Sequence, residues 1–418
     1  MGGDRPCPRG RARRRPAGGG LVKILFVVPP LTGHINPTLG LAHALSRRGH
    51  AVAWAGHASV LRSRLPADAT ILGLPEELER ETLGELIARA GAVKGLEIVK
   101  SRWEDVFIPL ARAMYPHVLS AIDGFRPDLL VVDHQAIGGA LAARRSGVPW
   151  ATLATTSVPL LDPFGSFPKV REWVDGLLAD LERWAGLVPT SNPDRSPAAV
   201  IVTSTPELAG ESALGPEVHW VGPILGPRPA AVPFPWERLD RTGRKKVLVS
   251  LGTVNAEIGG PFYAAMRDAL TAAPELQGII AGPPDIVGAM PEGTLIVPWV
   301  PQLELLGHVD AVVTHGGHNT VTEALLHGLP LVVAPIKDDQ PMVASQVAAS
   351  GAGVRVHNGR RANGAQIARA LRTVLTEPGY GAAARRIQIA FQNAGGAERA
   401  ADVVLNLVPT HAFPRDVP

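Results

Sequence analysis

Short apolar runs alternate with segments of helical periodicity from residue 22 onward. The first run, VKILFVVPP at 22–30, is rich in β-branched residues, as expected for a buried parallel strand. The segment that follows, 36–50, has apolar residues on one side and ends in Arg-Arg-Gly, which is a helix-stop pattern. The same alternation predicts further strands at 51–56, 127–133, 198–204 and 217–223.

A Pro-rich stretch at 222–241 interrupts this alternation and has the composition of a linker. The alternation then restarts with a strand at 245–253. Two such halves imply an α/β protein with two Rossmann-like, doubly wound parallel sheets that face each other across a cleft. We therefore divide the chain into 1–20, 21–225, 226–241, 242–405 and 406–418, and expect the last segment to pack back on the first half.

Composition and charge narrow the class of protein. The 418 residues are 46% hydrophobic and 19% charged, which is ordinary for a globular enzyme. The single cysteine, Cys7, excludes an intramolecular disulfide framework. No apolar run approaches the roughly 18 residues that a membrane span needs, so we expect a soluble, cytoplasmic protein.

The basic charge lies in one tail. The whole chain carries +3, residues 1–20 carry +5, and −2 is left for the remainder. Residues 1–20 are rich in Gly, Pro and Arg and have no apolar face, so we expect them to be disordered. They suit either a nucleic-acid-binding arm or an over-long start of the chain, and we favour the second.

The stretch AVVTHGGHNTVTEALLHG has the pattern of a phosphate-binding turn. An apolar strand runs into His315, and Gly316 and Gly317 then let the backbone turn sharply and approach a ligand. A helix is expected to begin near Asn319 and Thr320, and its free N–H groups and positive dipole end attract phosphate. Taken alone, the glycines are also explained by a tight turn without a ligand.

Glu323 has two interpretations. Thr320 and Glu323 have the spacing of a capping box, in which the Glu side chain accepts a hydrogen bond from the N-cap N–H. In a nucleotide site, the same carboxylate would instead accept hydrogen bonds from ribose hydroxyls. In isolation, the spacing favours the cap.

Residues on either side of this stretch change the balance. Upstream, Trp299 follows a strand and is placed to stack on a base, and Gln302 offers a donor and an acceptor to a pyrimidine edge. Downstream, Asp339 and Gln340 suit the hydroxyls of a sugar. An ordinary loop and a polar turn are the corresponding alternatives.

The first half has a turn of its own in VVPPLTGHINPTLGL. His34 lies between a strand and a helix whose first turn is expected to hold Pro37, a favoured position for proline. The positive end of that helix should disfavour protonation of His34, and a neutral imidazole accepts a proton near pH 7. Asp133 ends a later strand, where its carboxylate would fix the imidazole tautomer. A turn histidine and an N-cap aspartate are the alternatives; His57 and His134 lie outside the pattern.

In this order, the motifs closely resemble the nucleotide-sugar signature of the family 1 glycosyltransferases, the GT-B group that includes plant and bacterial natural-product enzymes. The match spans about 40 residues, and the two-half organisation extends it to nearly the whole chain after residue 20. Plant members carry Trp where this chain has His318, and the spacing from Trp299 to His315 is two residues shorter, as in many bacterial relatives. The donor base and sugar therefore stay open between UDP and dTDP and between a hexose and a deoxyhexose.

The resemblance implies a role for each residue, with the acceptor bound by 21–225 and the donor by 242–405. Trp299 and Gln302 would contact the base, Glu323 the ribose, and Asp339 and Gln340 the sugar. The residues implied for the diphosphate are Ser250, Gly252, Thr253, His315, Gly316, Gly317, Asn319 and Thr320. It also implies inverting transfer, with His34 as the general base oriented by Asp133. No metal and no cofactor beyond the nucleotide sugar are expected, and the chain has no Asp-x-Asp motif.

The expected acceptor is a hydrophobic natural product, and the Arg-rich, Lys-poor composition suggests a bacterial source. Residues 156–187 would either wall an apolar pocket or pack as ordinary helices; the aromatic residues concerned are Phe164, Phe167, Trp173 and Trp184. A homodimer is one option for the assembly, and neither nucleic acid nor a membrane is expected as a partner.

Two other functions suit a chain of this kind. A nucleotide-sugar epimerase would not need the Gly-His-x-x-Pro turn beside Asp133. A non-catalytic helper protein would be free to lose its donor residues, whereas nearly all of them are present. A dinucleotide-binding dehydrogenase is disfavoured, because PPLTGHINP follows the first strand in place of G-x-G-x-x-G.

Overall fold

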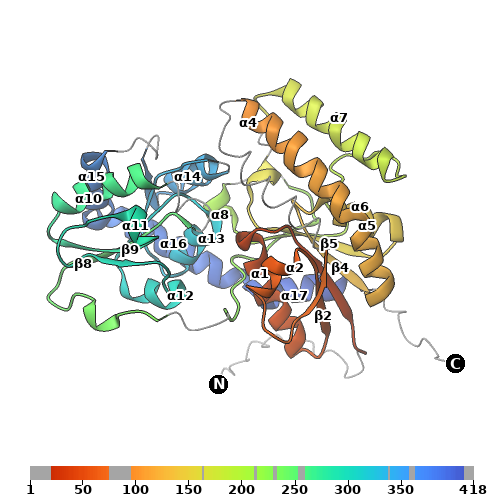
Figure 1. The fold of residues 1–418 in the computed structure, drawn as a ribbon, viewed down its shortest axis with the longest axis horizontal. Coiled ribbons are helices and arrows are strands. Elements are labelled where there is room, and N and C mark those ends of the chain that lie inside the picture. Colours follow the sequence, from red (N-terminus) through yellow and green to blue (C-terminus); the bar gives the residue numbers. More distant parts are fainter. Residues whose placement is uncertain are drawn as a thin grey trace, which may run out of the picture.

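Two α/β halves make up the molecule, seen on the right (N-terminal) and left (C-terminal) of Figure 1. The computed structural model describes residues 20–74, 96–161, 164–210, 214–228, 233–252, 259–337, 339–356 and 363–408. Within these residues each half contains one parallel sheet, and the strand orders are β3-β2-β1-β4-β5-β6-β7 and β10-β9-β8-β11-β12-β13. The predicted pair of doubly wound, Rossmann-like sheets is confirmed.

The strands are short and central to each half. Those of the first sheet are β1 (Lys23–Val27), β2 (Ala51–Gly56), β3 (Thr70–Gly73), β4 (Leu129–Asp133), β5 (Trp150–Ala154), β6 (Val200–Val202) and β7 (Val218–Trp220). Those of the second are β8 (Lys245–Ser250), β9 (Leu276–Ala281), β10 (Leu295–Val297), β11 (Ala311–Thr314), β12 (Leu331–Val333) and β13 (Gly353–Arg355). The edge strand β3 was not predicted, since its residues alternate only weakly between apolar and polar.

The helices connect successive strands and cover the sheets. In the first half they are α1 (Thr32–Arg47), α2 (Ala58–Arg62), α4 (Leu96–Ser101), the π-helix Arg102–Phe107, α5 (Ile108–Phe125), α6 (Ile137–Ser146), the 3-10 turn Val158–Leu161, α7 (Pro168–Trp184) and α8 (Pro206–Ala209). From the linker onward they are the 3-10 turn Trp236–Arg238, α10 (Gly260–Thr271), α11 (Pro284–Val287), α12 (Gln302–Leu305), the 3-10 turn Leu306–His308, α13 (His318–Leu326), α14 (Gln340–Ala349), α15 (Gly364–Thr376), α16 (Pro378–Ala394) and α17 (Gly396–Asn406).

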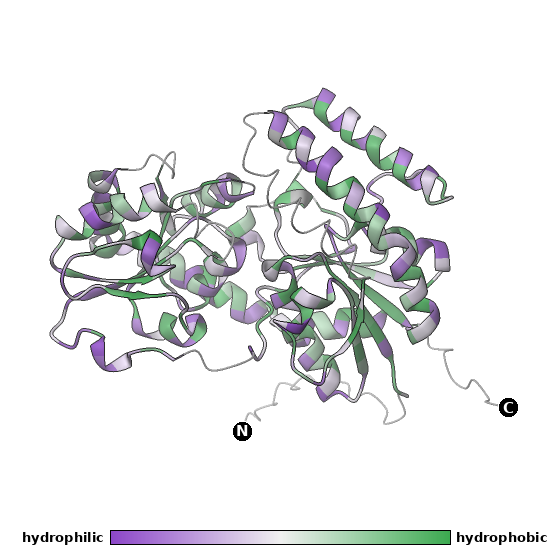
Figure 2. Cartoon of the chain, in the orientation of Figure 1, coloured by the Kyte–Doolittle hydropathy of each residue, from purple (hydrophilic) through white to green (hydrophobic). Residues whose placement is uncertain are grey.

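Each sheet is buried on both faces, which explains why its strands are continuous apolar runs. In β1, Ile24 and Phe26 face the core under α1, while Leu25 and Val27 face the core under α5 and α6. Figure 2 shows the central strands of both halves in the colours of hydrophobic residues. In parallel sheets the carboxyl ends of the strands meet at one edge, so the loops after β1, β4 and β5 converge, as do those after β8 and β11.

The last helix returns to the first half. Ala400, Ala401 and Val404 of α17 are buried in the same core as β1, and Figure 1 shows this helix, in blue, beside α1. Arg48 at the end of α1 also pairs with Glu398 and Asp402. The chain returns to the N-terminal half before the predicted boundary at 405, because α17 has an apolar face that the N-terminal half buries. Residues 409–418 of the predicted tail lie outside the described residues.

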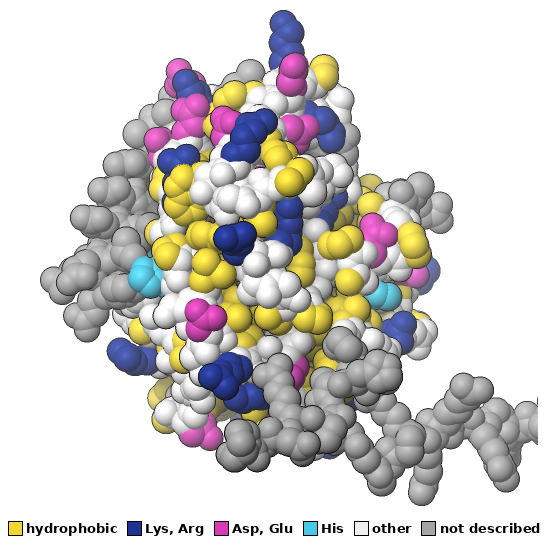
Figure 3. Space-filling view, turned by 90° about the vertical axis from the view of Figure 1, so that its right-hand side faces the viewer, with side chains coloured by type: hydrophobic (Ala, Val, Ile, Leu, Met, Phe, Trp, Pro, Cys, Tyr) yellow, Lys and Arg dark blue, Asp and Glu magenta, His cyan; other side chains and the backbone are white. Residues whose placement is uncertain are grey.

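Charged side chains are mixed by sign on the face of the N-terminal half drawn in Figure 3, where Lys and Arg alternate with Asp and Glu. This fits the small net charge of the chain without its tail. The predicted tail, 1–20, lies outside the described residues except for Gly20. Among the described helices, none has the length and apolar character to cross a membrane.

Candidate active site

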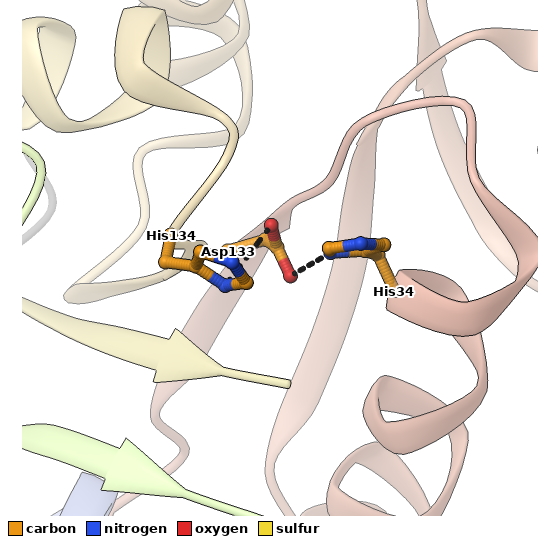
Figure 4. A group of neighbouring side chains, drawn as sticks. All are labelled: His34, Asp133 and His134. Carbon is orange, nitrogen blue, oxygen red and sulfur yellow. Dashed lines mark hydrogen bonds and ion pairs between the residues drawn. The ribbon is translucent and has the colours of Figure 1, made fainter. Parts of the chain in front are cut away.

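His34 and Asp133 come together at the carboxyl edge of the first sheet (Figure 4). His34 Nδ1 lies 2.9 Å from Asp133 Oδ2 and 3.0 Å from the hydroxyl oxygen of Thr155, which directly follows β5. Asp133 is fully buried, and its Oδ1 accepts a 2.8 Å hydrogen bond from the Gln135 N–H. The carboxylate therefore holds Nδ1–H, and Nε2 is left to accept a proton. Thr155 carried no motif, so sequence reasoning missed it.

His34 lies in the first turn of α1, which begins at Thr32 and not near residue 36 as predicted. Pro37 is consequently inside the helix and not in its first turn. Leu31, the N-cap residue, makes no side-chain cap. The His34 side chain is 15% exposed, and the carbonyl of the preceding Gly33 contacts Asn319 of the other half.

The electrostatics of His34 differ from the prediction. Burial of His34 opposes protonation, but the charge and hydrogen bond of Asp133 outweigh it, helped by the more distant Asp339, and the pKa of His34 is raised above 6.5. Burial alone would raise the pKa of Asp133, but His34, His134 and the Gln135 N–H together lower it below its ordinary value. The expected depression of the His34 pKa by the helix dipole is therefore wrong, because a carboxylate in contact outweighs partial charges at a helix end.

The glycines of the predicted phosphate turn surround one histidine. His315 follows β11 and is buried, and its imidazole lies between Gly252 and Gly317. A Cβ atom at either glycine would lie 2.8 or 2.6 Å from that ring. Gly316 has a φ of +93°, which favours glycine. The turn is therefore built so that backbone N–H groups and an imidazole share one small space.

Two predicted residues from the neighbouring strand can be placed only in part. Ser250 ends β8 opposite Thr314, and its hydroxyl accepts a 3.4 Å hydrogen bond from the Gly252 N–H. Gly252 itself has a φ of +67°. Thr253 lies outside the described residues. The first turn of α13, at His318, and the loop after β8 thus meet at the carboxyl edge of the second sheet.

Glu323 is not a helix cap. Helix α13 begins at His318, its N-cap residue Gly317 makes no side-chain cap, and Thr320 is already inside the helix. The buried Glu323 carboxylate instead pairs with Arg228, and its Oε2 accepts a 2.6 Å hydrogen bond from Gln302 Nε2. Arg228 comes from the linker and was not predicted, because nothing in its local sequence marks it.

The remaining predicted donor residues line the same edge. Trp299 is 55% exposed, and the guanidinium of Arg64, from the N-terminal half, lies 5.9 Å from its ring centroid. Asp339 is half-buried at the N-cap of α14. The buried Gln340 uses its side-chain oxygen to accept hydrogen bonds from the N–H groups of Ile336 and Lys337, both 2.9 Å long.

Residues from the two halves contact each other where the sheet edges meet. Asn319 Nδ2 donates a 3.0 Å hydrogen bond to the Gly33 carbonyl, and His318 Nε2 lies 3.2 Å from the Thr203 carbonyl oxygen. A carbonyl oxygen only accepts, so His318 donates through Nε2–H, and burial lowers the pKa of this imidazole. A pocket at this junction is lined by Asn36, Arg228, Asn319, Thr322 and Glu323, among others.

The aromatic residues proposed for an acceptor pocket divide into two kinds. Phe164 and Trp173 pack in a cluster with α5 and α7, which supports ordinary helical packing for them. Phe167 and Trp184 are about half exposed, and Trp184 makes an edge contact with Tyr115. Helical packing therefore accounts for Phe164 and Trp173, while Phe167 and Trp184 keep exposed apolar surface.

Among the described residues, one group of side chains has the spacing of a metal site: His34, Asp133 and His134. The residues at the second sheet's edge include glycines, amides, hydroxyls, His315, Asp339 and the paired Glu323. Within the described part of the chain they form no group with the spacing of metal ligands.

Comparison with known proteins agrees with this geometry. Residues 220–390 match the family model "UDP-glucoronosyl and UDP-glucosyl transferase". The chain is 30% identical to 4'-demethylrebeccamycin synthase of Lentzea aerocolonigenes, over 92% of this chain and 99% of that protein. It is also 30% identical to demethyllactenocin mycarosyltransferase of Streptomyces fradiae, over 96% and 90%.

Solved structures share the fold. The crystal structure of CalG4, the calicheamicin glycosyltransferase, superposes with a TM-score of 0.74 at 25% identity. The superposition covers 94% of this chain and 100% of the CalG4 chain. The spinosyn rhamnosyltransferase SpnG superposes with a TM-score of 0.73 at 22% identity. The chain thus belongs to the family 1 nucleotide-sugar-dependent glycosyltransferases and has their GT-B fold.

Proposed function

We propose that this glycosyltransferase moves a sugar from UDP or dTDP to a hydroxyl of a hydrophobic natural product, with inversion at the anomeric carbon. The N-terminal half would bind the acceptor and the C-terminal half the donor. The observation that carries the proposal is the 2.9 Å contact between His34 Nδ1 and Asp133 Oδ2, at the edge of the first sheet that faces the glycine turn of the second.

The chemistry follows from this arrangement. Asp133 holds Nδ1–H, so His34 Nε2 takes the proton from the acceptor hydroxyl. The freed oxygen forms a bond to the anomeric carbon from the side opposite the diphosphate. The carbon–oxygen bond to the diphosphate breaks, and its electron pair leaves with the nucleotide. Attack from the opposite side inverts the configuration.

The leaving diphosphate would be stabilised by the turn around His315. Helix α13 begins at His318, so its first N–H groups point to the same space as the imidazole of His315 and the backbone after Ser250. Such preorganised donors stabilise developing negative charge. The reaction as written uses no metal and no cofactor other than the nucleotide sugar.

A small hydrophobic natural product is the acceptor class supported best. Two relatives that align with nearly the whole chain are named as the synthase of 4'-demethylrebeccamycin and the mycarosyltransferase of demethyllactenocin. The side chain of Leu31, just before α1, is 37% exposed and provides apolar surface near His34.

The test compares His34→Ala with His43→Ala, because His43 lies in the same helix but is exposed. Calorimetric titration with UDP and dTDP, with and without Mg²⁺, measures the donor site. Transfer to a panel of polyketide and aromatic acceptors, with NMR assignment of the product anomer, measures the reaction. Both variants should bind nucleotide normally. His34→Ala should lose about 100-fold or more in kcat, whereas His43→Ala should keep the wild-type kcat.

The outcomes separate the alternatives. A retained anomeric configuration, or transfer by His34→Ala at the wild-type rate, would refute the base mechanism. Loss of transfer in the presence of EDTA would refute metal independence. Nucleotide binding without transfer to any acceptor would instead favour a helper protein, and interconversion of the donor sugar would favour an epimerase.

A further inference from the structure

His134 lies beside the dyad without a part in the proposed reaction. It follows Asp133 directly and is 8% exposed. Neither of its ring nitrogens makes a hydrogen bond of good geometry among the described residues, although the backbone of Leu153 is close enough to favour its protonated form. Its Nδ1 is 3.8 Å from Asp133 Oδ1, which is too long for a hydrogen bond. A buried imidazole whose nitrogens lack well-formed hydrogen bonds costs free energy unless it binds something.

The geometry around it is that of three ligands on one centre. In Figure 4 the Asp133 carboxylate lies between the two imidazoles, with Oδ2 toward His34 and Oδ1 toward His134. One ligand atom from each residue lies within 4.8 Å of the other two. Ligand atoms on a tetrahedral zinc ion are about 3.4 Å apart. Side-chain rotations that move the ligand atoms by about an ångström would therefore bring them into one coordination sphere.

We propose that His34, Asp133 and His134 form an inhibitory site for Zn²⁺ or a similar late first-row divalent ion. Two imidazoles and a carboxylate are a ligand set that Zn²⁺, Co²⁺ and Ni²⁺ prefer, whereas Mg²⁺ and Ca²⁺ prefer oxygen ligands. Three protein ligands leave a fourth position for water. Because His34 is 15% exposed while Asp133 and His134 are buried, the ion would enter from the exposed side of His34.

Ion binding and catalysis exclude each other at one atom. The ion takes the lone pair of His34 Nδ1, so the proton on Nδ1 must move to Nε2. Nε2–H is a donor and is unable to accept the proton of the acceptor hydroxyl. The ion also takes the Asp133 carboxylate that orients the ring. This consequence rests on the proposed base mechanism, whereas ion binding itself does not.

Binding is therefore measured on the full chain without substrates. Equilibrium dialysis against Zn²⁺ gives the stoichiometry, and the visible absorption of Co²⁺ reports nitrogen ligands in a low-coordinate site. The variants are His134→Gln and, as a matched control, His117→Gln, a histidine on α5 in the same half. His134→Gln should weaken Co²⁺ binding about 100-fold, since even outer-shell losses cost 10–100-fold, and His117→Gln should not.

A second measurement needs no variant. Zn²⁺ should protect His34 from modification by diethyl pyrocarbonate, mapped by mass spectrometry, while the exposed His43 stays reactive. For activity, each protein is compared with its own metal-free rate: Zn²⁺ should inhibit the wild type and His117→Gln, and His134→Gln should resist it about tenfold or more.

The outcomes of these measurements test the metal site and the base mechanism separately. Equal Zn²⁺ and Co²⁺ binding by wild type and a folded His134→Gln, or no protection of His34, would overturn the site. Site-specific binding that leaves transfer unaffected would keep the metal site and refute His34 as the base. Binding together with inhibition that His134→Gln relieves supports both.

Discussion

The side-chain amide of Asn319 donates a 3.0 Å hydrogen bond to the carbonyl of Gly33, the residue before His34. In an α-helix this carbonyl would accept from the N–H of the fourth residue on, which here is Pro37. Proline has no N–H, so the carbonyl stays available and the C-terminal half takes it. The bond joins the first turn of α13 in one half to the residue that precedes the candidate base in the other.

This relationship predicts a coupling between Asn319 and Pro37. Asn319→Ala should weaken the contact between the two halves by about 1 kcal/mol, which should appear as a several-fold fall in kcat. In a Pro37→Ala background, the new N–H of residue 37 takes the Gly33 carbonyl, so the same substitution should cost much less. A double-mutant cycle on kcat measures the coupling. Equal effects of Asn319→Ala in both backgrounds would contradict it.

The raised pKa of His34 predicts the pH dependence of transfer. The protonated imidazole is inactive as a base, so kcat/KM should fall as the pH drops through a value above 6.5. Asp133→Asn removes the charge that raises this pKa, so the midpoint should move to lower pH while the plateau falls about 100-fold or more. The measurement is kcat/KM between pH 5 and pH 9 for both proteins. An unmoved midpoint would mean that Asp133 does not act on His34.

The pair of Arg228 and Glu323 predicts a loss of stability that a second change repairs. Arg228→Ala leaves Gln302 as the remaining partner of the buried Glu323 carboxylate among the described residues, and should cost about 1–3 kcal/mol. The Tm of the wild type and the variants measures this. Adding Glu323→Gln removes the unpaired charge and still lets the residue accept from Gln302, so the double variant should recover most of the Tm. A double variant no more stable than Arg228→Ala would refute the charge explanation.

The imidazole of His315 predicts different tolerance at two glycines. At Gly317 the φ is ordinary, so Gly317→Ala adds only a Cβ that lies 2.6 Å from the ring. At Gly252 an alanine would meet the ring at 2.8 Å and also be strained by a φ of +67°. Both variants should weaken UDP or dTDP binding about tenfold or more, with Gly252→Ala also lowering the Tm. The matched control is Gly260→Ala, where nothing lies within 4 Å. Tight binding by Gly317→Ala would show that His315 is not needed in that position.

The fold class and most of the residues at the two sheet edges were predictable from the sequence. Apolar runs such as β4 and β11 are buried on both faces, so their composition alone identifies them, and glycines at turns such as Gly316 are required by local backbone geometry. Motifs of this kind depend on neighbours in the chain. They are therefore readable without a structure.

Tertiary structure alone decided which groups meet. Glu323 has the spacing of a cap but pairs with Arg228, 95 residues away, because the linker passes over the start of α13. Thr155 joins the dyad only because β4 and β5 are adjacent in the sheet. The pKa of His34 rises because a buried carboxylate lies at 2.9 Å, a distance that no local pattern encodes. Contacts between distant segments depend on how the sheets and halves pack, and local periodicity carries no information about that packing.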